Sequence, residues 1–134
     1  MMDILQDVSN EIEKILKKEC PDIPWMRTVM GPIFPKSLQG FIFCDEVNYD
    51  PFDKLGCKAT AEFTIEIICP NPKAISDEVE EKALMVRNVL QEYDTLHDLA
   101  EDSYVKKIIF ATPAGMTDVG VAIIQFVVIY DGGL

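Results

Sequence analysis

The hydrophobic positions of this chain recur with two different periods. Over residues 3–19 they lie three and four apart, which is the spacing of one buried helix face. Over residues 57–69 apolar and polar side chains alternate, which is the period of a strand with one buried face. Helical spacing then returns in a segment that Ser76 or Asp77 caps and that runs to about Tyr93. The pattern therefore predicts two main helices and one long strand.

Shorter apolar runs predict the rest of the sheet: residues 24–30, 41–47, 104–111 and 119–130. Residues 48–56 are rich in turn-forming side chains and predict the turn of an antiparallel hairpin before the long strand. We expect a short helical turn over residues 95–101 and a loop over residues 112–118. This order predicts the α+β class, with an antiparallel or mixed four- to five-stranded sheet and two main helices packed on one face. Without a linker or a repeat, residues 1–134 are expected to form a single α+β domain.

The last predicted strand is apolar on both of its sides. Two helices cover one face of a sheet, so a second apolar face is expected to be covered by something else. One interpretation is another subunit, which makes this strand a candidate oligomer interface with Val121, Ile123, Ile124, Gln125 and Phe126 as its residues. The other is a central strand in a strongly curved sheet, with a loop such as residues 31–39 folded across it. The sequence leaves both open.

Charge excludes some classes of partner. The formal net charge is −11 and only 12 of the 134 residues are lysine or arginine, so a basic nucleic-acid footprint is excluded, and binding to anionic membranes is disfavoured. The longest apolar stretch, residues 119–130, is too short for a membrane helix. The first residues carry no basic segment followed by an apolar run, so we expect no signal peptide. Acid concentrates in residues 77–102, with nine carboxylates against two basic side chains.

Motifs for catalysis are few. The single histidine, His97, lies in an acidic stretch and is interpreted as a surface residue rather than a general base. No metalloprotease, hydrolase or phosphate-binding motif is present, and the four cysteines form no CxxC pair and are expected to stay reduced. We therefore predict no catalytic residues, no cofactor and no metal. The alternative is a small α+β ligand-binding or enzymatic domain with a cleft near Cys44, His97 and Asp118.

Five segments together resemble the tail-terminator (tail-completion) proteins of long-tailed bacteriophages and prophages. They are ILQDVSNEIEKIL, KATAEFTIEIICP, DEVEEKALMVRNVL, SYVKKIIFATP and VGVAIIQFVVIYD. The resemblance implies a structural virion protein without enzymatic activity that caps the tail tube as an oligomeric, usually hexameric, ring. Such a ring ends tube polymerisation and provides the head-joining surface. A neck or other minor virion protein of similar fold is the nearest alternative.

The same resemblance implies partners and a location. The partners are further copies of the chain, a tail-tube protein and head–tail connector proteins, and DNA passes through the ring without specific binding. The protein is expected in the host cytoplasm during assembly and then in the virion tail, without a membrane partner. On this interpretation an acidic lumen or docking rim includes Asp77, Glu78, Glu80 and Glu81. The alternative is that these carboxylates form an ordinary solvated helix face.

Overall fold

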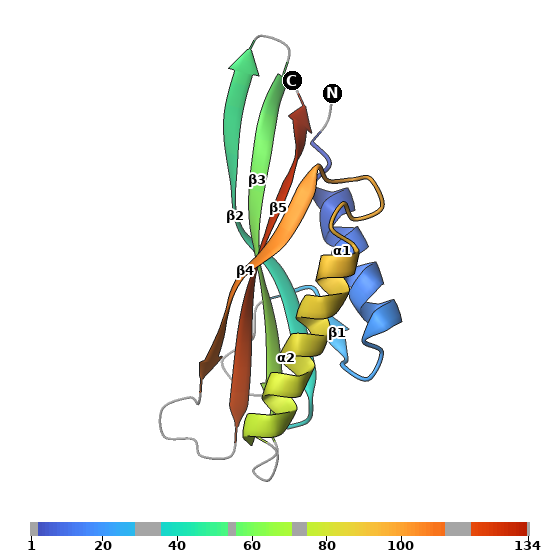
Figure 1. Cartoon of the computed structure of the whole chain (residues 1–134), viewed down its shortest axis with the longest axis vertical. Coiled ribbons are helices and arrows are strands. Elements are labelled where there is room, and N and C mark those ends of the chain that lie inside the picture. Colours follow the sequence, from blue (N-terminus) through green and yellow to red (C-terminus); the bar gives the residue numbers. More distant parts are fainter. Residues whose placement is uncertain (1–2, 29–35, 54–55, 71–74, 112–118, 134) are drawn as a thin grey trace.

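A computed structural model describes residues 3–28, 36–53, 56–70, 75–111 and 119–133. Figure 1 shows two helices side by side on one face of a twisted sheet. The elements in chain order are α1 (Leu5–Glu19), β1 (Trp25–Met26), β2 (Gln39–Asp53), β3 (Gly56–Cys69), α2 (Ile75–Glu92), β4 (Asp102–Ala111) and β5 (Gly120–Gly133).

The five strands form one mixed sheet in the order β1-β2-β3-β5-β4. β1 pairs with β2 in parallel, and every other neighbouring pair is antiparallel. Helix α1 contacts β1 and β2, whereas α2 contacts β3, β5 and β4. The predicted α+β class, with two helices on one face of a mixed sheet, is confirmed.

Helix α1 is held by its apolar stripe and by its first residues. Val8, Ile12 and Leu16 are fully buried in the core. The Asp3 carboxylate accepts a 2.8 Å hydrogen bond from the Leu5 N–H and a 3.1 Å hydrogen bond from the Tyr130 hydroxyl. Because the first turn of a helix leaves N–H groups without partners, Asp3 satisfies one of them and also ties the start of α1 to β5.

The hairpin of β2 and β3 is longer than predicted. Residues 48–53 were expected in a turn but continue β2, where Asn48 pairs with Thr60 and Pro51 with Cys57. The prediction of a turn over residues 48–56 is therefore wrong over most of its length. Turn-forming side chains are tolerated here because the partner is the regular strand β3, which β5 also supports along its length.

Each flank of the sheet contains a bulge near its middle. The pairing of β2 skips from Cys44 to Glu46, and that of β4 skips from Val105 to Lys107. Both irregularities adjoin the same row, meaning a line of register partners across the sheet. In this row Cys44 pairs with Phe63, Phe63 with Phe126, and Phe126 with Val105. Bulges increase the local twist, which accounts for the strong crossing of the strands at mid-height in Figure 1.

Two helix boundaries differ from expectation. Helix α2 begins at Ile75, so Ser76 and Asp77 lie in its first turn and not at its cap. After α2 the chain does not form the expected right-handed helical turn, because Leu96, His97 and Asp98 have φ values of 50°, 56° and 69°. These are left-handed conformations, which non-glycine residues adopt only where the surroundings impose them. Burial of the Leu96 side chain in the core supplies that constraint.

Gly40 provides the room in which Trp25 packs. The two residues are register partners of β1 and β2, and a methyl group added to Gly40 would lie 2.4 Å from Trp25 Cε3 and 2.9 Å from Ile23 Cγ2. We expect Gly40→Ala to lower the free energy of unfolding by about 1–3 kcal/mol, as overpacking does in other cores. Urea denaturation followed by Trp25 fluorescence measures this. Unchanged stability would show that the indole moves aside without loss.

Candidate interaction surface

The helix-free face of the sheet contains three of the five candidate interface residues. Along β5, Ile124 and Phe126 point toward the helices and are buried in the core, with exposed fractions of 0 and 1 %. Val121, Ile123 and Gln125 alternate with them and point the other way. The candidate interface therefore divides into two residues that support the fold and three on the helix-free face.

This face of β5 is not fully exposed within one chain. Val121 is buried together with Phe41, Ile68 and Val119 in a second, smaller hydrophobic cluster, against which the half-buried Ile123 packs. β5 is indeed a central strand, between β3 and β4. Of the loop that was the alternative cover, residues 31–35 lie outside the described part of the chain. An interface through Ile123 and Gln125 remains a proposal.

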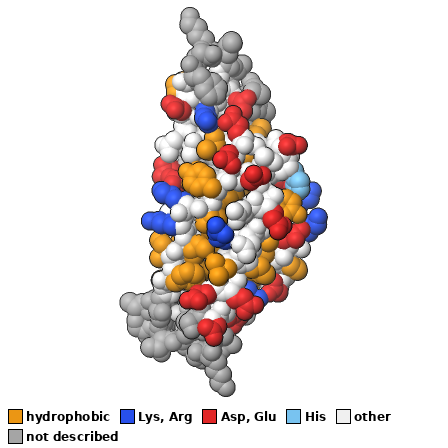
Figure 2. Space-filling view, in the orientation of Figure 1, with side chains coloured by type: hydrophobic (Ala, Val, Ile, Leu, Met, Phe, Trp, Pro, Cys, Tyr) orange, Lys and Arg blue, Asp and Glu red, His pale blue; other side chains and the backbone are white. Residues whose placement is uncertain are grey.

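Exposed apolar side chains gather instead on the edge strand β4. Tyr104, Ile109 and Phe110 are 49, 39 and 47 % exposed, and Leu84 on the neighbouring helix α2 is 50 % exposed. Figure 2 shows hydrophobic side chains between the upper and lower acidic groups of this view. These β4 residues were not predicted from the sequence as a surface. The unbroken run from Ile108 to Ala111 is apolar on both sides, the same signal that singled out β5.

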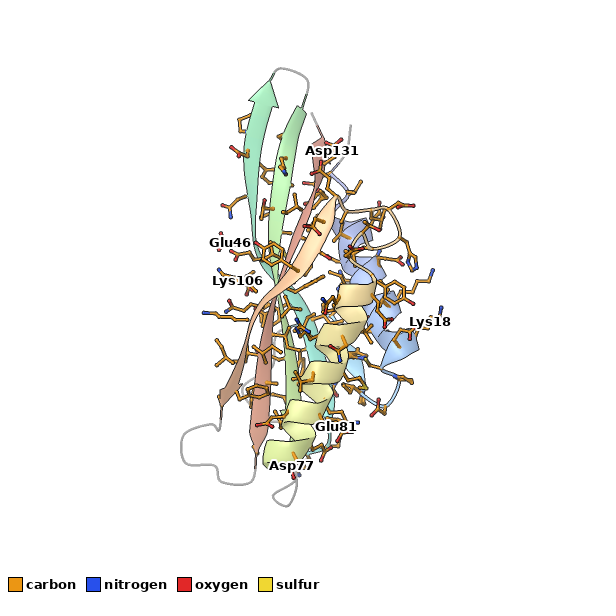
Figure 3. The ribbon with its side chains drawn as sticks, viewed as in Figure 1. Lys18, Glu46, Asp77, Glu81, Lys106 and Asp131 are labelled. Carbon is orange, nitrogen blue, oxygen red and sulfur yellow. The ribbon has the colours of Figure 1, made fainter. Side chains whose placement is uncertain are left out.

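A polar hollow of about 330 Å³ lies at the centre of the helix-free face. Its lining includes Asp45, Glu62, Thr64 and Lys106. Lys106 Nζ lies 3.5 Å from Glu62 Oε1, and the Thr64 hydroxyl donates a hydrogen bond to Asp45. Figure 3 shows Glu46 and Lys106 on the side of the sheet away from the helices. These contacts link β2 to β3 and β3 to β4 across β5, so the hollow is a polar centre of this face.

Beside the hollow, Glu66 has a perturbed acidity. Burial raises the pKa of its carboxyl above the ordinary value, and the nearby Asp45 adds to the effect. A raised carboxyl pKa means that the folded state binds the proton more tightly than the unfolded state. The charge on Glu66 therefore costs stability at neutral pH, and that cost disappears as the pH falls below the ordinary pKa. Covering this face with a partner would increase the same penalty.

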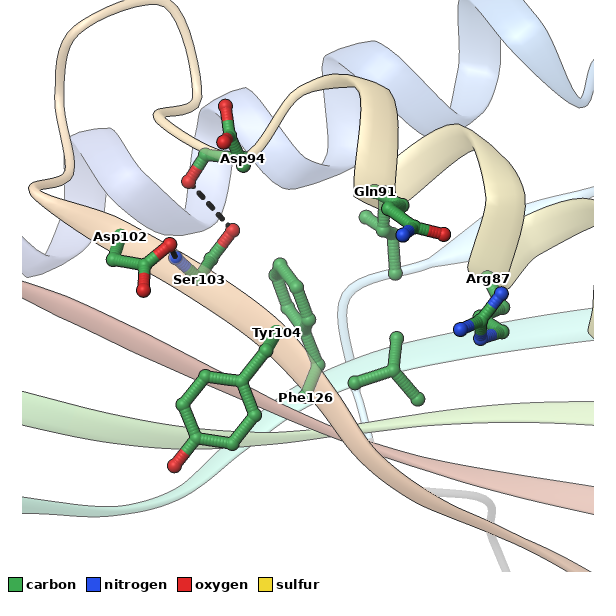
Figure 4. A pocket seen from close by; sticks show the side chains of 9 residues that line it. Arg87, Gln91, Asp94, Asp102, Ser103, Tyr104 and Phe126 are labelled. Atoms are coloured by element: carbon green, nitrogen blue, oxygen red, sulfur yellow. Dashed lines mark hydrogen bonds between the residues drawn. The ribbon is translucent and has the colours of Figure 1, made fainter.

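A second hollow, of about 280 Å³, lies between the end of α2 and β4 (Figure 4). Its polar lining includes Arg87, Gln91, Asp94, Asp102 and Ser103. The Ser103 hydroxyl donates a 2.7 Å hydrogen bond to the Asp94 carbonyl, and the Ser103 N–H donates to Asp102. No histidine is among the residues that line it. Ser103 thus fastens the turn after α2 to β4, and its hydroxyl proton is donated to a backbone carbonyl.

The cleft expected for a ligand-binding or enzymatic domain is not assembled by the described residues. His97 interacts with Glu11 and packs edge-on against Tyr93, and the hollow that these three line does not include Cys44. Cys44 lies on β2, where burial raises the pKa of its thiol. Asp118, the third residue of that cleft, lies outside the described residues.

Cys20 and Cys69 are also poor nucleophiles. All four are free thiols. Burial raises the pKa of Cys20 and of Cys69 to about 11, so both remain protonated at neutral pH. Within the described part of the chain, no three cysteine, histidine or carboxylate side chains gather as metal ligands.

The acidic cluster occupies the beginning of α2. Asp77, Glu80 and Glu81 are exposed, whereas Glu78 is half-buried. Figure 3 shows Asp77 and Glu81 at the lower end of the molecule. Next to them Lys82 donates a hydrogen bond to Asp22, which lowers the pKa of the Asp22 carboxyl. Carboxylates in a first helical turn are also favoured by the helix dipole, so their position has a structural reason in addition to any functional one.

Comparisons with known proteins identify the fold. No family model matches the chain, no curated protein matches it, and none of the described helices is long and apolar enough to span a membrane. Among solved structures, a chain of the virion of a native gene transfer agent particle is similar, with a TM-score of 0.52 and 14 % identity over 96 % of this chain and 95 % of that one. A second solved protein has 15 % identity over 93 % of this chain and 95 % of its own, with a TM-score of 0.38. At these identities the first likeness establishes that this chain shares, over nearly its whole length, the fold of a virion component.

Proposed function

We propose that this chain is a structural virion protein that caps a phage tail tube as an oligomeric ring. In this role it ends tube polymerisation and provides the surface that joins the head. Its partners are further copies of the chain, the tail-tube protein and head–tail connector proteins. It is present in the host cytoplasm during assembly and in the virion tail afterwards. The role requires neither a catalytic residue nor a cofactor.

The observation that carries this proposal is the end-to-end likeness to a chain of a gene transfer agent virion. The match covers 96 % of this chain and 95 % of the other, so it extends over the sheet and both helices rather than one shared motif. The resemblance of five segments to tail terminators rests on the sequence alone and indicates the same kind of particle. The exposed apolar side chains of β4 add a physical reason for self-association, since large exposed apolar patches mark partner surfaces.

The capping role is tested by the length of tubes. Tail-tube protein from a neighbouring gene is polymerised in vitro with and without substoichiometric amounts of this chain, and the tubes are measured by electron microscopy. We expect shorter tubes that carry a ring of additional density at one end, because one ring per tube suffices to stop growth.

The control is the same addition of protein that has been unfolded by heat, which is expected to leave tube length unchanged. Tubes of equal length with and without the folded chain, and without density at their ends, would contradict the capping role.

A further inference from the structure

We propose that copies of this chain join head to tail through the two edges of the sheet, β4 of one copy lying against the β1–β2 edge of the next. This proposal rests on the proposed ring and names the surfaces that form it. The two edges are different surfaces, so the contact is heterologous, and a heterologous contact closes into a ring when its rotation allows.

Both edges of the sheet are open among the described residues. β4 is the last strand and pairs only with β5. On the opposite side, β1 pairs with β2 only at Gly40 and Phe41, so no described strand lies beside the rest of β2. An open edge presents backbone N–H and C=O groups that another chain can pair with, and monomers usually protect such an edge. The bulge and the two lysines protect the middle of β4, whereas Ile109 and Phe110 beyond them are large, apolar and exposed.

Strand direction suits this arrangement. β2 and β5 run one way, and β3 and β4 run the other, because each pairing across the sheet from β2 to β4 is antiparallel. Rotation about an axis nearly parallel to the strands keeps these directions in the next copy. β4 would therefore meet β1 and β2 in antiparallel orientation, the more stable form of strand pairing.

The register of the sheet supplies matching side chains at matching heights. A closed ring has no rise between copies, so residues at one height on the two edges meet. Met26 on β1 and Ile109 on β4 are the ends of one row, which runs through Phe41, Glu66 and Ile123. Met26 is 49 % exposed and Ile109 39 % exposed. Each edge thus offers an uncovered apolar side chain at the height of the other.

Charge is complementary a few residues further along the edges. The bulge residues Asp45 on β2 and Lys106 on β4 flank the same row of the sheet. Next to them, Glu46 and Lys107 are exposed, and Lys107 forms no ion pair with a described residue. The two pairs lie on opposite sides of that row, since Glu46 shares a row with Tyr104 and Lys107 shares one with Phe43, two rows away. In a chain of net charge −11, lysines on one edge within two rows of carboxylates on the other favour a second copy over an acidic partner in general.

Disulfide trapping tests this contact with the full chain. Met26→Cys and Ile109→Cys are combined in one variant, and the purified protein is oxidised with copper phenanthroline and run on a non-reducing gel. Within one copy the two positions are separated by four strand spacings, roughly 19 Å, which no disulfide can span. We expect a ladder of linked copies that ends at the size of the ring. Both positions are exposed, so the substitutions are expected to leave the fold intact.

The controls distinguish head-to-tail pairing from the alternatives. Met26→Cys alone, Ile109→Cys alone and the unmodified chain are expected to give no ladder. Dimers of either single variant would show like edges meeting and would overturn the proposal. Absence of a ladder would overturn it too. If light scattering then shows a ring, the ring stands and its contact lies elsewhere. If it shows a monomer, tube length alone decides the capping role.

Discussion

Ile124→Lys is expected to unfold the protein. The side chain is fully buried between Ile65 on β3 and Ile108 on β4, its register partners, and beneath the helices. None of these neighbours offers a counter-charge, so an ammonium group there would be buried without a partner. The cost is expected to exceed about 4 kcal/mol, a large share of the roughly 5–15 kcal/mol that stabilises a typical domain. Circular dichroism during urea denaturation measures the loss.

Ile123→Lys is the matched variant, one residue earlier on the opposite face. Its side chain is only half-buried, and its register partner on β3 is Glu66. A lysine at position 123 therefore gains a counter-charge that a glutamate would lack. We expect a folded protein with a modest loss of stability. If both variants unfold, the two faces of β5 are equally part of the core. If Ile123→Lys folds but forms a smaller particle, the interface extends from the sheet edge onto this face.

Reversing the acidic cluster is expected to reduce the yield of infectious particles strongly without unfolding the chain. In the proposed ring these carboxylates line the lumen or its rim, through which DNA passes. A triple Asp77→Lys, Glu80→Lys, Glu81→Lys variant would attract the DNA phosphates and slow this passage. The three side chains are exposed, so each substitution is expected to change stability by only about 0.5 kcal/mol, with a similar amount from the helix dipole. Titre is measured beside electron microscopy of tail length, which is expected to remain normal.

A neutral triple variant, Asp77→Asn, Glu80→Gln, Glu81→Gln, separates two explanations. It removes the negative charge without adding phosphate attraction, so its titre is expected to stay close to that of the unmodified chain. A normal titre for the lysine variant would show that the cluster is an ordinary solvated helix face. Abnormal tails for both variants would indicate a docking rim rather than a lumen.

Local pattern was sufficient for the regular elements. The alternation over residues 57–69 predicted β3 within one residue, and the helical spacing over residues 3–19 predicted α1 closely. It was insufficient where contacts between residues far apart in the sequence determine the local structure. Residues 48–53 carry turn-forming side chains, yet the pairing with β3 makes them a strand. The left-handed turn at Leu96 follows from burial of its side chain, which no local preference encodes.

The candidate surface was predicted only in part, for a related reason. The sequence shows that β5 is apolar on both sides, but the alternation of side chains along a strand does not say which side the helices cover. That Ile124 and Phe126 belong to the core became clear only with the helices in place. The exposure of Tyr104 and Ile109 depends on β4 being an edge strand, and strand order is a property of the whole sheet.

The strand order also determines when this protein can fold during its synthesis. β5 follows every other described element in the sequence, yet it lies between β3 and β4 and pairs with both. When the ribosome has finished β4, that strand still lacks its neighbour, and the hairpin of β2 and β3 presents an unpaired inner edge. Only the emergence of residues 120–133 joins the β2–β3 hairpin to β4. A nascent chain therefore passes through a stage in which β3 and β4 both have open edges where β5 will lie. A pause in translation before β5 would therefore lengthen the period in which copies of the chain can pair wrongly through these edges.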